Sequence, residues 1–227
     1  MEYKIENGKL RIDSLTLEID NLTFIEEIGS GANANVFLAS NALLNRNEAV
    51  KVWIPHKGRS GVDPERFEAE VQKNACFDGL SNIAKLYDAA CSNGIYYARL
   101  QYIEGQILKD YLVSERELLD RLNIIEKILL TLKAAYEKGV YHGDLHGGNI
   151  IVKNNEPFII DFGTSLFSGE DKSHKRDCRM IIETALKILP ELNDFDFFDE
   201  SVFISQDSKI IIELLHNLSR LVWDIKK

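Results

Sequence analysis

The first hundred residues alternate apolar and polar positions in short runs, a spacing typical of β-strands. Residues 10–19 alternate over the longest stretch, and residues 24–28 lead into a glycine-rich turn. Further short strands are expected at residues 36–39, 48–53, 83–90 and 94–102, with turn residues at 45–47. One helix is expected at residues 65–77, because Asp63 and Pro64 form a typical helix start. This half is predicted to be a β-sheet with one helix.

From about Gly105 the apolar spacing becomes helical. Ser114 and Glu117 have the spacing of a capping box, in which two side chains bind free N–H groups at a helix start. The buried stripe of this long helix would be Leu118, Leu122, Ile125, Leu129 and Leu132. The helix is predicted to end near Gly139, and two more are expected at residues 177–189 and 209–223. The sequence therefore predicts an α+β fold with a β-rich N-terminal lobe and an α-helical C-terminal lobe.

Composition narrows the class of protein. The formal net charge of −9 argues against a general nucleic-acid binder, because phosphate backbones select basic surfaces. Three cysteines with no CxxC pair indicate buried free thiols and a reducing cytoplasm. No run approaches the ~20 apolar residues of a membrane span, and the N-terminus is charged where a secretory signal is apolar. We expect a cytoplasmic protein of one large domain or two small lobes.

Two segments of the N-terminal half could bind phosphate. Gly29, Ser30 and Gly31 follow a strand, and such a turn is either an ordinary hairpin or a loop whose N–H groups cover phosphates. Lys51 lies twenty residues after Gly31 among Ala49, Val50, Val52 and Trp53. An ammonium group facing inward from such a strand needs an anionic partner.

The strongest segment is residues 141–152, followed by residues 158–163. Asp144 and Asn149 are five residues apart, and Asp161 follows twelve residues later, each beside a short apolar strand. An independent transition-metal site is not favoured, because no third His or Cys ligand has suitable spacing.

In order and spacing, these segments resemble the protein-kinase signature set of a glycine-rich loop, strand lysine, catalytic loop and Asp-Phe-Gly. The resemblance runs from about Leu22 to Leu189. It implies one protein-kinase-like, bilobal domain over residues 1–227, with an N-lobe at about 1–100, a hinge at about 101–105 and a shortened α-helical C-lobe at about 106–227. ATP and Mg²⁺ would be the cofactors.

The resemblance also implies roles for individual residues. Asp144 would be the catalytic base, assisted by Lys51 and Asn149, while Asn149 and Asp161 would bind Mg²⁺. Lys51 would hold the α- and β-phosphates and pair with Glu70, or with Glu68 if the helix register differs. The ATP-binding residues would be Gly29, Ser30, Gly31, Ala34, Val36, Ala49, Lys51, Glu70, Leu100, Gln101, Tyr102 and Ile103, with Leu100 as gatekeeper. Asp177 would begin a helix and brace the catalytic loop.

The chain also departs from the family pattern. Ala34 replaces the third glycine of the loop, at a modest expected cost if the backbone there is unusual. Gly143 replaces the arginine that pairs with a phosphorylated activation loop, and His146 replaces a lysine near the γ-phosphate. Only residues 164–176 separate Gly163 from Asp177, which resembles the small atypical kinases of the RIO, KEOPS-complex and Kdo types. We therefore expect activity without prior phosphorylation.

Several functions stay open at this point. A serine/threonine protein kinase fits best, with ATP and a protein substrate as partners. A small-molecule kinase acting on a sugar or antibiotic-like acceptor, an ATPase and a pseudokinase share the same fold. The acidic, aromatic residues 193–203 are either a packed loop or a docking site for a protein partner. No nucleic-acid or membrane partner is expected.

Overall fold

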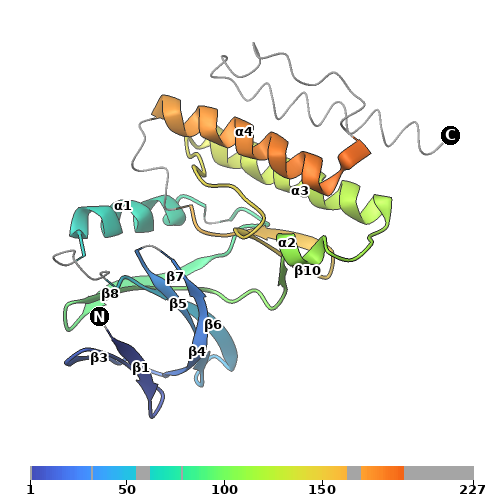
Figure 1. The fold of residues 1–227 in the computed structure, drawn as a ribbon. Helices are drawn as coiled ribbons and strands as arrows, with labels where there is room; N and C mark the ends of the chain where they lie inside the picture. Colours follow the sequence, from blue (N-terminus) through green and yellow to red (C-terminus); the bar gives the residue numbers. More distant parts are fainter. Residues whose placement is uncertain (1, 32, 55–61, 78, 163–169, 192–227) are drawn as a thin grey trace. The chain divides into compact units, whose positions relative to one another are not determined.

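The computed structural model describes residues 2–31, 33–54, 62–77, 79–162 and 170–191 of the 227-residue chain. The chain forms two compact units, Met1–Asp78 with Ala84–Tyr102, and Gly79–Ile83 with Ile103–Lys227 (Figure 1). The boundary divides the predicted hinge, because Gln101 and Tyr102 belong to the first unit and residues 103–105 to the second. The predicted helix at 209–223 and the loop at 193–203 lie outside the described residues.

An antiparallel sheet forms most of the first unit. Its strands are β4 (Leu22–Ser30), β5 (Asn35–Asn41), β6 (Arg46–Val52), β7 (Leu86–Ser92) and β8 (Ile95–Gln101), in the order β4-β5-β6-β8-β7. Asn93 and Gly94, with φ values of 52° and 77°, join β7 to β8 in a tight turn whose left-handed backbone suits these residue types. The strands predicted from the alternation are confirmed, with their ends shifted by a few residues.

A smaller sheet precedes the main one. It consists of β1 (Tyr3–Glu6), β2 (Lys9–Ile12) and β3 (Leu15–Leu17). The prediction of one strand over residues 10–19 is wrong, because the chain reverses after β2, where Asp13 has a φ of 49°. The apolar side chains of this sheet share one core with β4, β5 and β6, in which Leu10, Leu17, Phe24, Phe37 and Val50 are buried.

The second unit combines a small sheet with helices. Strands β9 (Gln106–Ile107), β10 (Ile150–Lys153) and β11 (Glu156–Ile159) pair in the order β11-β10-β9. The helices are α2 (Leu108–Tyr111), α3 (Leu118–Glu137) and α4 (Glu170–Ile188), and α3 and α4 lie side by side (Figure 1). Within the described residues, no helix is long and apolar enough to cross a bilayer.

The long helix α3 confirms the predicted apolar stripe but not its predicted start. Leu122, Ile125, Leu129 and Leu132 are buried, whereas Leu118 of the predicted stripe is only partly buried. The helix ends before Gly139, which has a φ of 73°. The capping box is wrong, because α3 begins at Leu118 and no side chain caps it. The Arg116 guanidinium instead donates to the carbonyl of Tyr111 and lies 3.9 Å from the centre of its ring, which holds the preceding segment outside the helix.

Two further expectations are corrected. Asp177 does not begin a helix, because α4 starts seven residues earlier at Glu170. The cysteines were expected to be buried, yet Cys76 and Cys91 are exposed free thiols.

Candidate functional site

In the first unit, Lys51 and Glu70 form an ion pair. Lys51 lies near the end of β6, paired with Val36 of β5 on one side and Ala98 of β8 on the other, and its Nζ is 2.5 Å from Glu70 Oε1. The two side chains are only 14% and 9% exposed. The alternative partner, Glu68, is exposed on the same helix. The structure thus gives the Lys51 ammonium the anionic partner that its apolar surroundings require.

Helix α1 (Pro64–Ala75) owes its register to an aromatic contact. Asp63 caps the helix by accepting a hydrogen bond from the N–H of Glu65, with Pro64 in the first turn. Phe67 packs edge-on against Trp53, with ring centroids 4.9 Å apart, and equally close to Tyr96. Glu70 lies one turn after Phe67, so the same face of the helix carries both residues.

The glycine-rich segment is a tight hairpin between β4 and β5. The N–H of Gly31 donates to the carbonyl of Ala34 at 2.9 Å, and Gly29 pairs with Val36. A Cβ atom at Gly31 would lie 3.2 Å from the Ala34 oxygen, so a side chain there would crowd the turn. The backbone N–H groups of this turn are the part suited to phosphate.

Ala34 does not carry the cost that its replacement of a glycine suggested. Among the described residues, positive φ values occur only at Gly, Asn and Asp, so Ala34 has an ordinary backbone. Its methyl group is buried in a cluster with Trp53 and Phe67. An alanine at this position therefore adds packing without adding strain.

A carboxylate joins the two strands of this hairpin to the N-terminal sheet. Glu27 of β4 accepts a hydrogen bond from the Asn35 side chain at 3.2 Å and from the Tyr3 hydroxyl at 2.7 Å. Tyr3 also packs edge-on against Phe37 of β5, with centroids 5.6 Å apart. This link could not be predicted from the sequence, because Tyr3 and Glu27 are far apart in the chain and belong to no motif.

The predicted adenine-binding residues lie along β6 and the end of β8. Ala49 faces Leu100 across the sheet, and the N–H of Gln101 donates to the carbonyl of Lys85 at 2.8 Å. Tyr102 ends the first unit, and Ile103, which is buried, begins the helical part of the second.

In the second unit, a buried carboxylate fixes the loop that carries Asp144. Asp177 of α4 accepts hydrogen bonds from the N–H groups of His142 and Gly143, and from the Tyr136 hydroxyl of α3 at 3.0 Å. The φ of Gly143 is 80°, a conformation that an arginine would adopt only with strain. Gly143 therefore suits the backbone here, besides replacing a regulatory side chain. The bracing role expected for Asp177 is seen in these contacts, although the residue lies inside the helix.

His142 is part of this support and is neutral. Burial lowers its pKa to about 4, against the effect of its hydrogen bond to the Ile160 carbonyl. Its Nδ1 accepts from the N–H of Asp144 at 3.2 Å, so the proton is assigned to Nε2, which lies 3.0 Å from the Ile160 oxygen. The ring also packs against Phe162, with centroids 4.6 Å apart.

The Asp144 carboxylate is partly exposed and has two basic neighbours. Arg176 Nη2 of α4 is 2.6 Å from Oδ1, and His146 Nε2 is 3.6 Å from Oδ2. The side chain of Asn149 donates to the backbone carbonyl of Asp144 at 2.9 Å. Sequence reasoning missed Arg176, whose only signal was its position directly before Asp177.

Strand pairing holds Asn149 and Asp161 close together. Asn149 directly precedes β10, and Asp161 follows β11 by one residue. The N–H of Ile160 donates to the carbonyl of Asn149 at 2.9 Å. Asp161 is exposed and has a φ of 63°, an uncommon backbone state that recurs at functional sites. The Asn149 and Asp161 side chains offer the oxygen ligands that Mg²⁺ prefers.

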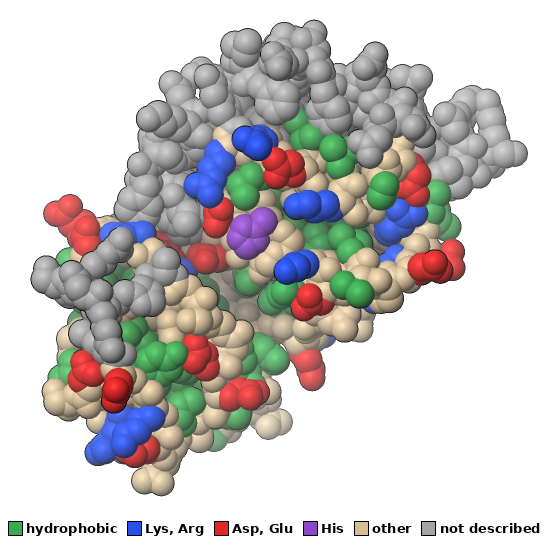
Figure 2. Space-filling view, viewed as in Figure 1, with side chains coloured by type: hydrophobic (Ala, Val, Ile, Leu, Met, Phe, Trp, Pro, Cys, Tyr) green, Lys and Arg blue, Asp and Glu red, His purple; other side chains and the backbone are tan. Residues whose placement is uncertain are grey.

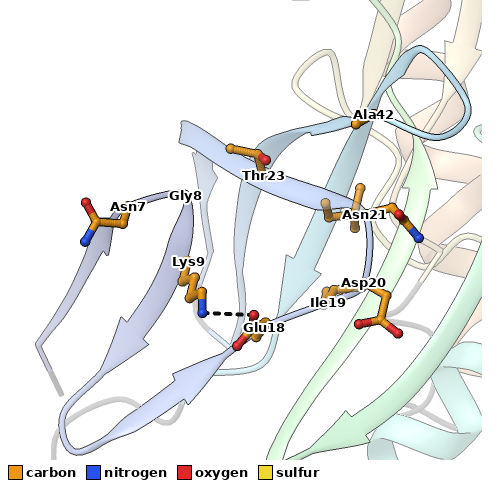
Figure 3. Close-up of a pocket in the computed structure, with 10 residues that line it drawn as sticks. Asn7, Gly8, Lys9, Glu18, Ile19, Asp20, Asn21, Thr23 and Ala42 are labelled. Carbon is orange, nitrogen blue, oxygen red and sulfur yellow. Dashed lines mark ion pairs between the residues drawn. The ribbon is translucent and has the colours of Figure 1, made fainter.

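A separate pocket on the first unit lies between the two sheets (Figure 3). It is lined mainly by polar residues around an ion pair of Lys9 with Glu18, and by residues 19–23. The described residues that line it include none of the predicted site residues, so it is not the candidate site.

Comparison with known proteins relates these residues to a family. Residues 22–185 match the family model described as the protein kinase domain. Serine/threonine-protein kinase PrkC of Bacillus subtilis is 32% identical over 139 residues, which are 60% of this chain and 21% of that protein. Serine/threonine-protein kinase PknB of Mycolicibacterium smegmatis is 28% identical over 173 residues, 73% of this chain and 28% of that protein. The chain thus spans less than a third of the length of either relative.

A solved structure gives the same relation at the level of the fold. The kinase domain of Mycobacterium tuberculosis PknI superposes with a TM-score of 0.66 at 14% sequence identity. The alignment covers 90% of this chain and 97% of that one.

Proposed function

The chain belongs to the protein kinase family, and from this premise we propose that it is an ATP-dependent serine/threonine protein kinase. The predicted kinase fold, with a β-rich N-lobe and a helical C-lobe, is confirmed by the family match and the PknI structure. The observation that carries the proposal is the support of Asp144. Its loop is fixed by Asp177, and its carboxylate is left 25% exposed.

The first unit would hold the nucleotide. Lys51, fixed by Glu70, would pair with the α- and β-phosphates, and the N–H groups of Gly29, Ser30 and Gly31 would cover them. Ala34 would belong to the same phosphate-covering loop, and the adenine would contact the remaining predicted residues, which are Val36, Ala49, Leu100, Gln101, Tyr102 and Ile103. Their support is position within the matched family region, residues 22–185.

The proposed metal ligands are Asn149 and Asp161. They fit Mg²⁺, because both offer oxygen atoms and the hydrogen bond from Ile160 to Asn149 keeps the two segments adjacent. When bound, the metal would neutralise charge on the phosphate oxygens. The bond from Asn149 to the Asp144 carbonyl would couple the metal ligand to the base.

The chemistry assigned to the chain is one proton and one phosphoryl transfer. The Asp144 carboxylate would accept the proton of a serine or threonine hydroxyl. The hydroxyl oxygen would form a bond to the γ-phosphorus as the bond to the β-phosphate oxygen breaks. The products would be a phosphorylated protein and ADP.

Two finer features belong to the same proposal. Helix α4 begins at Glu170, eight residues after Phe162, which supports the likeness to small atypical kinases and activity without prior phosphorylation. A cytoplasmic location is supported by the exposed free thiols of Cys76 and Cys91, which persist in a reducing compartment.

The test is phosphate transfer from Mg²⁺-ATP to casein, followed by intact mass and phosphosite mapping. Asp144→Ala should lower the rate at least about 100-fold, because a positioned base contributes that much, while ATP binding changes little. Glu126→Ala, which alters an exposed carboxylate of α3, is the control and should act as wild type.

ADP release without protein phosphorylation would instead favour the small-molecule kinase or the ATPase. Full activity of Asp144→Ala would remove the base assignment. Prior phosphatase treatment should leave the wild-type rate unchanged.

A further inference from the structure

Helix α4 contacts the catalytic loop through two consecutive residues. Asp177 holds the backbone of His142 and Gly143, and Arg176 holds the Asp144 carboxylate through Nη2 and Oδ1 at 2.6 Å. The first contact is fully buried, whereas the Arg176 side chain is 53% exposed. One helix therefore fixes both the backbone of the loop and the orientation of its functional carboxylate.

The charges around Asp144 make Arg176 the distinctive neighbour. His142 is buried with a lowered pKa and carries no charge near neutral pH. His146 lies 3.6 Å from the other carboxylate oxygen and is cationic only when protonated. Among the described residues, Arg176 is the one permanent cation within 4 Å of the Asp144 carboxylate. Figure 2 shows charged side chains of both signs spread over one face of the second unit.

We propose that Arg176 is a positioning residue that holds the Asp144 carboxylate by Oδ1 and leaves Oδ2 to accept the substrate proton. This inference rests on the proposed kinase function. The bond is charge-assisted and short, so it fixes the carboxylate more firmly than solvent would. Because the contact comes from α4, it is built into the helix and requires no phosphate group elsewhere in the chain.

The expected effect falls on turnover rather than on nucleotide binding. Arg176→Met keeps a long side chain that suits a helix but removes the charge and the donors. We expect kcat to fall about 10- to 100-fold, a part of what a positioned base contributes. The KM for ATP should stay within about twofold, because the described contact of Arg176 is with Asp144.

Two further variants separate positioning from structural support. Arg176→Lys restores a cation at the same helix position. The logarithm of its kcat should recover at least about a third of the difference between Arg176→Met and wild type. The Arg176→Met, His146→Lys double variant places a cation beside Oδ2, 3.6 Å from where the histidine now lies, and should recover activity in part. If Arg176 only stabilised the fold, a cation at residue 146 would not raise the kcat of the Arg176→Met variant.

The matched control is Arg179→Met. Arg179 lies on the same helix, is 77% exposed, and pairs with Glu183 rather than with the loop, so kcat should be unchanged. Thermal unfolding of every variant should match wild type within a few degrees, because these side chains are largely exposed.

The outcomes distinguish this inference from the function on which it rests. A wild-type chain that transfers no phosphate overturns the proposed function and this inference together. An active wild type whose Arg176→Met variant keeps the same kcat overturns the inference alone, as does a rise in the KM for ATP that accounts for the whole loss.

Discussion

At the scale of single residues, His142 and Asp177 are buried ionisable groups with opposite pKa shifts. Burial raises the pKa of Asp177 to about 6 from 3.8, although the N–H groups of Gly143 and His142 and the Tyr136 hydroxyl favour its ionised form. Burial lowers the pKa of His142 to about 4 from 6.5. The folded state therefore favours the neutral form of both side chains, and their effects on stability have opposite signs.

The signs follow from proton binding in the two states. Between pH 4 and 6 the folded chain binds more protons at Asp177 than the unfolded chain, so its contribution to stability is lost as pH rises. At His142 the unfolded chain binds more protons between pH 4 and 6.5, so stability is gained as pH rises. The two contributions largely cancel in the wild type.

Comparison of the wild type with Asp177→Asn should isolate the contribution of Asp177. The free energy of unfolding of wild type, minus that of Asp177→Asn, should fall by about 2–3 kcal/mol from pH 4 to 6.5, because one pKa unit corresponds to about 1.4 kcal/mol. Urea unfolding of both proteins at three pH values measures this difference, and other titrating groups cancel in the subtraction. Parallel pH profiles for the two proteins would contradict the assignment.

Residues that are recognised by their type and their order along the chain were predicted from the sequence. A residue whose contact depends on the position of a helix was missed. Lys51, Asp144, Asn149 and Asp161 were predicted because their spacing along the chain forms a pattern. Arg176 was missed because residues 170–177 are almost entirely polar, so no apolar period marked the start of α4. Its contact with Asp144 exists only once that helix is in place.

At the scale of elements, one largely buried ion pair links β6 to α1. Lys51 and Glu70 are 14% and 9% exposed, and the Lys51 ammonium also lies 5.4 Å from the centre of the Trp53 ring. Removing one charge of such a pair leaves the other in apolar surroundings, which costs more than loss of the attraction itself. The packing of Phe67 on Trp53 keeps the helix near the strand in either case.

Glu70→Gln should lower both stability and activity. We expect a loss of about 1–3 kcal/mol in the free energy of unfolding, less than for a fully buried pair. Phosphate transfer should fall about 10-fold or more, because Lys51 would no longer be fixed for the phosphates. Glu68→Gln, at an exposed position on the same helix, is the control and should change neither quantity by a measurable amount. Equal behaviour of the two variants would exclude the assigned role of Glu70.

Element boundaries were less predictable than element types. The strand alternation over residues 10–19 was real, but it continued across a reversal at Asp13, so two strands looked like one. The spacing of Ser114 and Glu117 indicated a helix start, yet residues 112–114 form a turn and a bend, Arg116 contacts Tyr111, and Glu117 is the N-cap. In both places the local sequence pattern predicted a boundary that differs from the observed one, and one residue marks the difference.

At the scale of the whole molecule, the order of strands and helices carried the prediction. The change of apolar period near residue 105 predicted a β-rich part followed by a helical part, and the two compact units divide at Tyr102 and Ile103. The proposed reaction needs ATP and Mg²⁺, so both should stabilise the folded chain. A ligand that binds only the folded state stabilises it in proportion to the logarithm of its concentration.

Mg²⁺-ATP should therefore raise the unfolding temperature of the chain. At 100 times its dissociation constant the expected stabilisation is about 2.7 kcal/mol, which corresponds to about 5–11 °C for a chain of this size. Thermal scans with ATP and EDTA in place of Mg²⁺ should show a smaller rise, since the proposed ligands Asn149 and Asp161 would lack the metal. In Asp161→Ala the difference between the Mg²⁺ and EDTA scans should largely be lost, because the carboxylate ligand is removed.

Lys51→Met should weaken the rise in both conditions, since it removes the phosphate contact but not the metal ligands. Glu126→Gln is the control for an exposed carboxylate and should behave as wild type. A metal dependence that persists in Asp161→Ala would place the Mg²⁺ site elsewhere. An unchanged rise in Lys51→Met would show that Lys51 does not contribute to nucleotide binding.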